Sequence, residues 1–199
     1  MTRNFRAVTA EFNALYNGDK ALIEGNEELA ANYRDNFWDI LPIERFEIKE
    51  AILKPREKGN PNFNRAEDKA AKAIQRHSIY INGKEYNPQI DEAYMLLGKA
   101  RYYSQRFVPA IDAFNFILNR YPSSNSINEA RMWKAKSNIQ LGNEDVAIKE
   151  LAELFGKKGL TVQDKADAAA IMAQAYINLD TLEAALPMIQ LAAEMVQDK

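Results

Sequence analysis

Cysteine is absent from the 199-residue sequence, and histidine occurs once, at His77. Without cysteine the chain forms no disulfide and offers neither a thiol nucleophile nor a thiolate metal ligand. A single histidine excludes the two-histidine and three-histidine zinc sites that one chain can otherwise build. The sequence therefore predicts neither a metal site nor a bound cofactor.

Charge of one sign and long apolar runs are also scarce. The 26 Lys and Arg residues nearly balance the 28 Asp and Glu residues, which gives a net charge of -2. Because binding to nucleic acid or to an anionic membrane needs a basic surplus, both classes of partner are disfavoured. The sequence has no run of the roughly 18 apolar residues that a membrane-spanning helix needs, and no apolar stretch of signal-peptide length follows Met1. We expect a soluble polypeptide with no nucleic-acid partner.

The sequence motifs of common enzymes are missing as well. It contains no glycine-rich phosphate loop and no nucleophile elbow. The carboxylate pairs Glu27-Glu28 and Asp91-Glu92 are adjacent in predicted helices, so their side chains diverge instead of meeting at one atom. We predict no catalytic residue and no enzymatic activity.

Residues 1–45 predict a helical hairpin followed by an aromatic segment. Apolar residues at helical spacing over residues 4–17 and again over 19–36 indicate two helices. The Asn-Gly-Asp sequence around Gly18 is expected to end the first helix and begin the second. The apolar segment at residues 37–43 is interpreted as a core plug that pins the hairpin against the next element, and a ligand-facing aromatic site is the alternative.

Residues 46–62 have the composition of a linker, with two prolines, a glycine and several charges near its end. Residues 63–88 then predict a partial repeat. Helical spacing over residues 63–77 fits the second helix of a repeat unit, whose first helix the sequence does not assign. An Asn-Gly pair between short β-prone runs predicts a small β-hairpin near residues 79–86.

Residues 89–199 repeat themselves. A shift of 37 residues aligns Glu92 with Glu129, and a shift of 38 residues aligns Glu129 with Asp167. Each period contains two helical segments joined by a short turn, which predicts three helix-turn-helix units. Their predicted bounds are 89–124, 125–161 and 162–199.

This period resembles that of the tetratricopeptide repeat (TPR). Gly98 and Ala110 are expected to let the two helices of the first unit pack closely, and Ala135 and Ala173 keep a small residue at the position of Gly98 in the later units. We predict an all-α fold, a TPR-like solenoid of helical hairpins. The residues of the first unit that match the TPR signature are Tyr94, Leu97, Gly98, Phe107, Ala110, Phe114 and Pro122.

The first helix of each unit lines the concave face in such solenoids. In the repeat frame this face receives an acidic, then an apolar, then a cationic residue in successive units, a pattern that would allow an extended peptide to bind by charge and shape. The alternative is that the charged residues only solvate an exposed face and the methionines fill the core. The candidate partner-binding residues are Glu92, Met95, Lys99, Tyr102, Tyr103, Glu129, Met132, Lys136, Gln140, Asp167, Gln174 and Asn178, with Ile139 and Ile177 beside them.

Several strings go beyond what the repeat requires. They are TAEFN at 9–13, LYNG at 15–18, YRDNFWDILP at 33–42, YNPQIDEAY at 86–94, LGKARY at 97–102 and RFVPA at 106–110. In these strings the chain resembles the PorW/SprE family of TPR lipoproteins from Bacteroidota, which is associated with type IX secretion and gliding motility. The resemblance extends over nearly the whole chain.

The resemblance implies an outer-membrane lipoprotein that faces the periplasm. It implies a non-enzymatic scaffold that links the secretion translocon to other components of the machinery, with proteins as partners. The lipoprotein signal and lipidated cysteine of the family are absent here and family members are longer, so the chain resembles an N-terminal fragment. Contact with the membrane is then expected only through a lipid anchor that this chain does not carry.

Two other functions remain open at the level of sequence. A glycan-capturing lipoprotein similar to SusD, or one that binds peptidoglycan, would stack sugar rings on Trp38, Tyr102, Tyr103 or Trp133. An outer-membrane assembly factor or chaperone similar to BamD would bind the tails of client proteins in the groove.

Overall fold

The computed structural model describes residues 14–38, 40–44, 59–157 and 159–197. These residues form eight α-helices and one two-stranded β-hairpin. The elements are, in chain order, α2 (Tyr16–Asn32), α3 (Pro61–His77), β1 (Tyr80–Ile81), β2 (Lys84–Glu85), α4 (Ile90–Tyr103), α5 (Phe107–Arg120), α6 (Ile127–Gln140), α7 (Glu144–Phe155), α8 (Val162–Asn178) and α9 (Leu182–Gln197).

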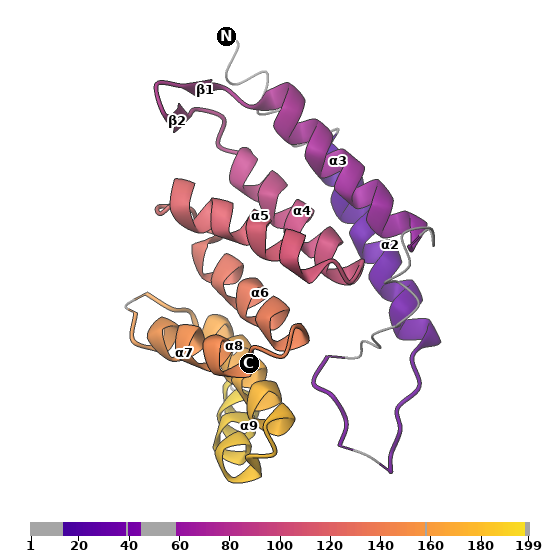
Figure 1. The fold of residues 1–199 in the computed structure, drawn as a ribbon, viewed down its shortest axis with the longest axis vertical. Coiled ribbons are helices and arrows are strands. Elements are labelled where there is room, and N and C mark those ends of the chain that lie inside the picture. Colours follow the sequence, from indigo (N-terminus) through magenta and orange to yellow (C-terminus); the bar gives the residue numbers. More distant parts are fainter. Residues whose placement is uncertain (1–13, 39, 45–58, 158, 198–199) are drawn as a thin grey trace.

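The helices stack in pairs along the long axis of the molecule, from α2 and α3 at one end to α8 and α9 at the other (Figure 1). Each pair packs against the next, and the first helices of successive pairs, α2, α4, α6 and α8, also contact one another in turn. The prediction of an all-α solenoid of helical hairpins is therefore confirmed. The last three pairs fall within residues 89–124, 125–161 and 162–199.

Small residues set the distance between the helices of a pair. A Cβ atom at Gly98 in α4 would lie 2.3 Å from the Phe114 ring in α5, so only glycine permits this approach. Ala135 and Ala173, which occupy the position of Gly98 in the next two units, are fully buried. Phe114 is fully buried as well, and burial of such a side chain stabilises a fold by about 2 to 3 kcal/mol.

The N-terminal part of the chain differs from the prediction. We predicted a helix break around Gly18, but α2 continues through this position. Gly18 is buried, and a Cβ atom there would lie 2.4 Å from Leu96 Cδ2. The glycine therefore permits α2 to lie against α4 and does not end a helix. The predicted helix over residues 4–17 falls mostly outside the described residues.

The helix α2 is the first helix of the unit that the sequence left incomplete. It packs along α3, where a Cβ atom at Gly25 would lie 2.5 Å from the Phe63 ring (Figure 1). We expected the linker at residues 46–62 to separate two units, but helices on either side of it pack as one pair. The linker residues 45–58 lie outside the described residues.

The aromatic segment at residues 37–43 is not a core plug. Trp38 is 98% exposed and Phe37 is 79% exposed, so that prediction is wrong. Phe37 and Trp38 lie in a turn, and no helix or strand of the described fold covers their rings. From Pro42 onward, the segment lies against the body of the solenoid.

The predicted β-hairpin is confirmed. Asn82 and Gly83 have φ angles of 50° and 79°, the left-handed values that a two-residue turn between β1 and β2 requires. The Glu85 carboxylate closes the hairpin against the end of α3, because it accepts hydrogen bonds from the Ser78 hydroxyl at 2.5 Å and the Ile79 amide at 2.7 Å.

In the described part of the chain, every helix is too short or too polar to cross a membrane.

Candidate functional site

A groove of about 680 Å³ runs along the inner face of the solenoid. Its walls come from the first helices α4, α6 and α8, and one side is closed by three residues of the connection between α2 and α3. These three residues, Pro42, Ile43 and Glu44, are called the strap below. The other residues that line the groove are Asn125, in the turn before α6, and the helical residues Tyr102, Glu129, Met132, Trp133, Lys136, Ile139, Gln140, Asp164, Asp167, Ala170, Ile171, Gln174 and Asn178.

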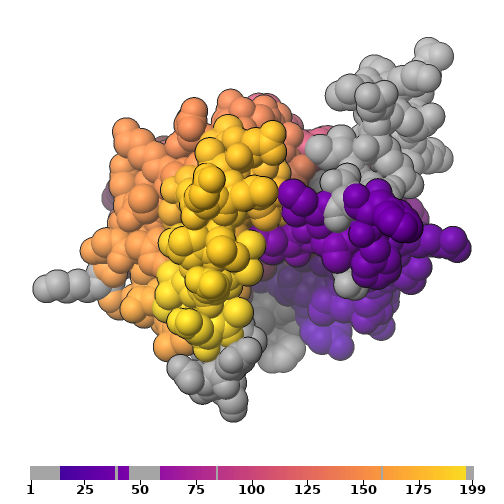
Figure 2. Space-filling model, turned by 90° about the horizontal axis from the view of Figure 1, so that it is seen from below, coloured from indigo at the N-terminus to yellow at the C-terminus, as the bar shows by residue number. Residues whose placement is uncertain are grey.

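The strap bridges repeat units that are distant in sequence. In Figure 2, which looks along the stack from the α9 end, the violet N-terminal segment lies beside the orange and yellow helices of the last unit. There the Ile43 amide donates a hydrogen bond of 2.7 Å to Gln174 Oε1 on α8. The donor is a backbone amide, so any non-helical segment with a free amide at this point can make the same hydrogen bond. The contact therefore does not depend on the identity of the side chain.

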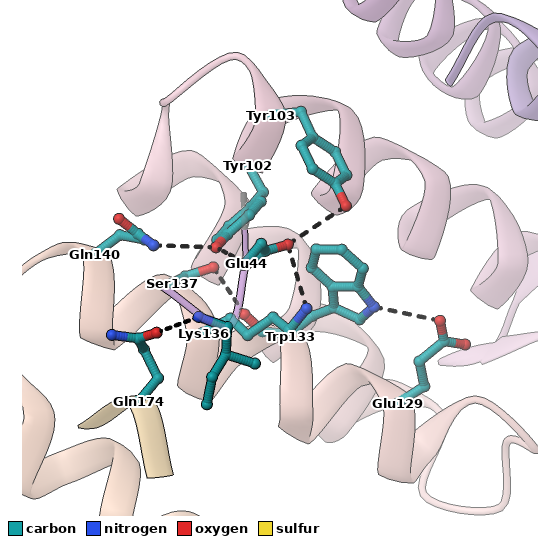
Figure 3. Close-up of polar contacts among 10 residues, drawn as sticks. Glu44, Tyr102, Tyr103, Glu129, Trp133, Lys136, Ser137, Gln140 and Gln174 are labelled. Carbon is teal, nitrogen blue, oxygen red and sulfur yellow. Dashed lines mark hydrogen bonds and ion pairs between the residues drawn. The ribbon is translucent and has the colours of Figure 1, made fainter. Parts of the chain in front are cut away.

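The Glu44 carboxylate lies at the centre of the groove (Figure 3). Glu44 Oε2 accepts a hydrogen bond of 2.6 Å from the Tyr102 hydroxyl, and Oε1 accepts one of 3.5 Å from the Tyr103 hydroxyl. Lys136 Nζ on α6 lies 3.3 Å from the same Oε1. Gln140 adds a hydrogen bond of 3.3 Å from Nε2 to the Tyr102 hydroxyl oxygen. Donors from two helices thus converge on one carboxylate.

Burial keeps the two tyrosines in their neutral, hydrogen-bond-donating form. The pKa of Tyr102 is raised above its ordinary value of 10.0, first because the hydroxyl is buried and then because the Glu44 charge disfavours a phenolate beside it. The same two causes raise the pKa of Tyr103. Both hydroxyls therefore carry their protons at neutral pH and are available to a carboxylate.

The Trp133 ring positions the cation of the groove. Lys136 Nζ lies over this ring, 4.5 Å from its centroid, and 3.3 Å from Glu44 Oε1. The indole Nε1 donates a hydrogen bond of 3.3 Å to Glu129 Oε1, which fixes the ring. Lys99 forms a 2.6 Å ion pair with Glu129, so its charge is already engaged.

The α8 end of the groove is acidic. Asp164 and Asp167 line it, and Asp164 also forms a capping box with Thr161 at the start of α8. Gln174 is held in place by a 2.9 Å hydrogen bond from its Nε2 to Asn178 Oδ1. The groove therefore has a cationic region at Lys136 and an anionic region toward the start of α8.

Most of the predicted residues lie together on this surface, as the repeat frame required. Met95 is the clearest exception, because it is buried in the core between α4, α5 and α6. Glu92 and Lys99 are on α4 but do not line the groove, and Tyr103 reaches it only through its hydroxyl. The predicted residues that line the groove are Tyr102, Glu129, Met132, Lys136, Gln140, Asp167, Gln174 and Asn178.

Sequence reasoning missed Glu44 and assigned Trp133 no role in the groove. Trp133 follows the predicted Met132 by one residue, so its position in the repeat could have indicated that it lies near the groove. Glu44 lies outside every repeat unit that the sequence predicted, and no periodicity points to a residue in a connection between two helices.

The aromatic residues considered for sugar stacking are mostly engaged with one another. The Tyr102 ring is fully buried and lies edge-on to the rings of Tyr103 and Trp133, with centroids 5.4 Å and 5.2 Å away. Of the four aromatic residues, Trp38 is the one with an exposed ring face.

Within the described ranges, no group of three or more His, Asp or Glu side chains lies close enough together to hold a metal ion. Comparison with protein-family models gives no match, and comparison with curated proteins gives none either. The fold and the chemistry of the groove therefore carry the functional argument.

Proposed function

We propose that this protein is a non-enzymatic scaffold whose groove binds a segment of a protein partner. The observation that carries the proposal is the strap itself, because a non-helical segment already lies in the groove. Side chains from three successive first helices contact it: Tyr102 on α4, Lys136 on α6 and Gln174 on α8. Peptide recognition combines hydrogen bonds to the backbone with contacts to side chains. This surface makes both, because it binds one backbone amide and one side chain of the strap across three repeats.

The resemblance to the PorW/SprE family extends this proposal to a biological setting. In that setting the protein is part of the type IX secretion and gliding machinery, at the periplasmic face of the outer membrane. The scaffold would link the translocon to other components through the groove. One of the strings that support this resemblance, residues 33–42, leads into the strap and ends at its first residue, Pro42.

The test is partner capture from the cell envelope of a Bacteroidota species, with the captured proteins identified by mass spectrometry. Lys136→Glu is expected to reduce recovery of a component of the secretion machinery at least about tenfold, because reversal of a desolvated charge costs several kcal/mol. Lys136 is preferred to Lys99, because Lys99 does not line the groove and its ammonium group is paired with Glu129.

Lys134→Glu provides a matched control for this capture. Lys134 is on the same helix and forms a 2.7 Å ion pair with Glu150, and its side chain is 21% exposed compared with 26% for Lys136. Both substitutions break one ion pair, but Lys134 does not line the groove. Equal recovery by the two folded variants would contradict the proposal.

A second candidate function is glycan capture, and the observation that favours it is the exposure of Trp38. A ring that is 98% exposed next to another exposed ring, Phe37, offers a stacking surface outside the groove. Titration with oligosaccharides or peptidoglycan fragments would change the fluorescence of Trp38 in a saturable manner. Loss of that response in Trp38→Phe, with full response in Trp133→Phe, would support this candidate.

A further inference from the structure

The strap makes the contacts that a bound peptide ligand would make. The Ile43 amide is held by Gln174, and the next residue, Glu44, places its carboxylate between Tyr102 and Lys136. We infer that the groove recognises an acidic segment of a partner protein, in which an aliphatic residue is followed by a glutamate, and that this segment displaces the strap. The inference rests on the proposed function and names the chemical class of its ligand.

The donor set selects a carboxylate over a neutral side chain. Tyr102 and Tyr103 donate hydroxyl hydrogens and Lys136 donates from an ammonium group, so both carboxylate oxygens accept. A glutamine in the place of Glu44 would turn one acceptor into an NH₂ donor that faces these donors. Hydrogen bonds to a charged partner are also about twice as strong as neutral ones.

The buried hydroxyl of Tyr102 adds to this selectivity. Its side chain is fully buried, and departure of the strap would remove the carboxylate that accepts its hydrogen at 2.6 Å. A segment that covers this hydroxyl without offering a carboxylate would bury the donor without that acceptor, which costs free energy. An incoming carboxylate restores the contact, whereas an apolar segment of the same shape does not.

The charges along the groove limit the ligand further. Among the described lining residues outside the strap, the positive charge is at Lys136. Negative charge is at Asp164, Asp167 and Glu129, the last of which is paired with Lys99. The strap passes from Gln174 on the acidic α8 side to Lys136 in the chain direction. A segment with one acidic residue, preceded by apolar or neutral residues, therefore fits better than a run of acidic residues.

The strap and the residues before it keep much of their apolar surface exposed. The residues before it are exposed, with Trp38 98% and Ile40 53% exposed, and Ile43 itself is 43% exposed. These side chains therefore lose little burial of their own when the strap leaves the groove. Because it is tethered at both ends, however, its effective concentration is of the order of millimolar, and it competes with any ligand in solution.

Fluorescence anisotropy with two short peptides tests the inference. The probe is a dye-labelled peptide with the sequence of residues 40–44, Ile-Leu-Pro-Ile-Glu, with an amidated C-terminus so that the glutamate supplies its only carboxylate. The matched peptide has glutamine in place of the glutamate. The proteins are the full chain and its variants Glu44→Gln, Glu44→Gln with Lys136→Met, Glu44→Gln with Lys134→Met, and Glu44→Gln with Gln174→Ala.

We expect the glutamate peptide to bind the Glu44→Gln chain about tenfold or more tightly than the wild-type chain, because the internal competitor is weakened. On that variant, the glutamate peptide should bind about tenfold or more tightly than the glutamine peptide. Lys136→Met should reduce this difference between the peptides, because only the two tyrosine donors remain, and Lys134→Met should preserve it. Circular dichroism and a thermal melt of each variant establish that it is folded.

Two results overturn the inference, and they separate it from the proposed function. If both peptides bind equally and Gln174→Ala weakens both, the groove binds peptides without selecting a carboxylate, so the proposed function survives and the inference is wrong. If neither peptide binds any folded variant at millimolar concentration, the inference is wrong, and the partner capture described above decides the proposed function. Should Glu44→Gln fail to fold, titration of the wild-type chain with the two peptides tests the same discrimination at weaker affinity, and equal affinities overturn it.

Discussion

Lys136 Nζ lies 3.3 Å from Glu44 Oε1, although 92 residues separate the two in sequence. Lys136 belongs to the repeat array, and Glu44 belongs to the connection that precedes it. The contact therefore brings a non-helical segment onto the inner surface of the solenoid.

Hydrogen exchange at Ile43 reports whether the strap occupies the groove in solution. The Ile43 amide donates to Gln174 Oε1 at 2.7 Å, so Gln174→Ala should speed exchange at this amide at least about fivefold, since a hydrogen bond contributes about 1 kcal/mol. The control is Gln190→Ala, at an exposed position on α9. Unchanged exchange at Ile43 in Gln174→Ala would contradict the described position of the strap.

Alkaline unfolding tests the burial of Tyr102. Its pKa in the folded chain is raised above the ordinary 10.0, so folding stability from this group is complete below pH 10 and falls as the pH rises above it. Tyr102→Phe removes the titrating group, so the variant should lose stability less steeply between pH 10 and pH 12 than the wild-type chain. Chemical unfolding at a series of pH values measures this slope.

The matched substitution for the alkaline experiment is Tyr16→Phe, at a position that is 65% exposed. We expect this variant to show the wild-type slope. An equal slope for Tyr102→Phe and the wild-type chain would show that Tyr102 is not held in a buried, protonated state.

Gly98→Ala tests the close packing of α4 on α5. The new Cβ atom would lie 2.3 Å from the buried Phe114 ring, and such overpacking costs about 1 to 3 kcal/mol. The better helix propensity of alanine offsets up to about 1 kcal/mol of this cost. We expect a net loss of about 1 kcal/mol or more in the free energy of unfolding, measured by urea denaturation.

Gly156→Ala is the control for this loss. A Cβ atom at Gly156 would meet its nearest neighbour, the Glu153 carbonyl oxygen, at an ordinary distance of 3.6 Å, and the residue has a φ angle of -71° that alanine adopts freely. The variant should be as stable as the wild-type chain or slightly more stable. Stability that is the same in Gly98→Ala and Gly156→Ala would contradict the described packing.

The repeat array was predictable because its signal is periodic. Spacing of apolar and small residues, such as Gly98 and Ala110, indicated both the helices and their pairing. The same frame placed Lys136 and Gln174 on the inner face. Each of these predictions needed only local sequence and one repeated geometry.

The N-terminal part was predicted less well because its contacts are distant in sequence. Gly18 was interpreted as a helix stop, whereas its function is to let α2 approach Leu96 on α4. The aromatic residue Trp38 was interpreted as core because apolar composition gives no information on which side of a loop faces solvent. Glu44 gave no signal, since its partners are up to 92 residues away.

Site-specific photocrosslinking in the cell envelope tests the central claim, that the groove binds a protein partner. The photoreactive residue replaces Asn125, which is exposed and lines the groove, or Lys149, which is exposed on α7 outside it. We expect a crosslinked component of the secretion machinery from position 125 that Lys136→Glu removes and Lys134→Glu preserves, with no such product from position 149. A product from position 149 alone, or a product from position 125 that Lys136→Glu leaves unchanged, would contradict the claim.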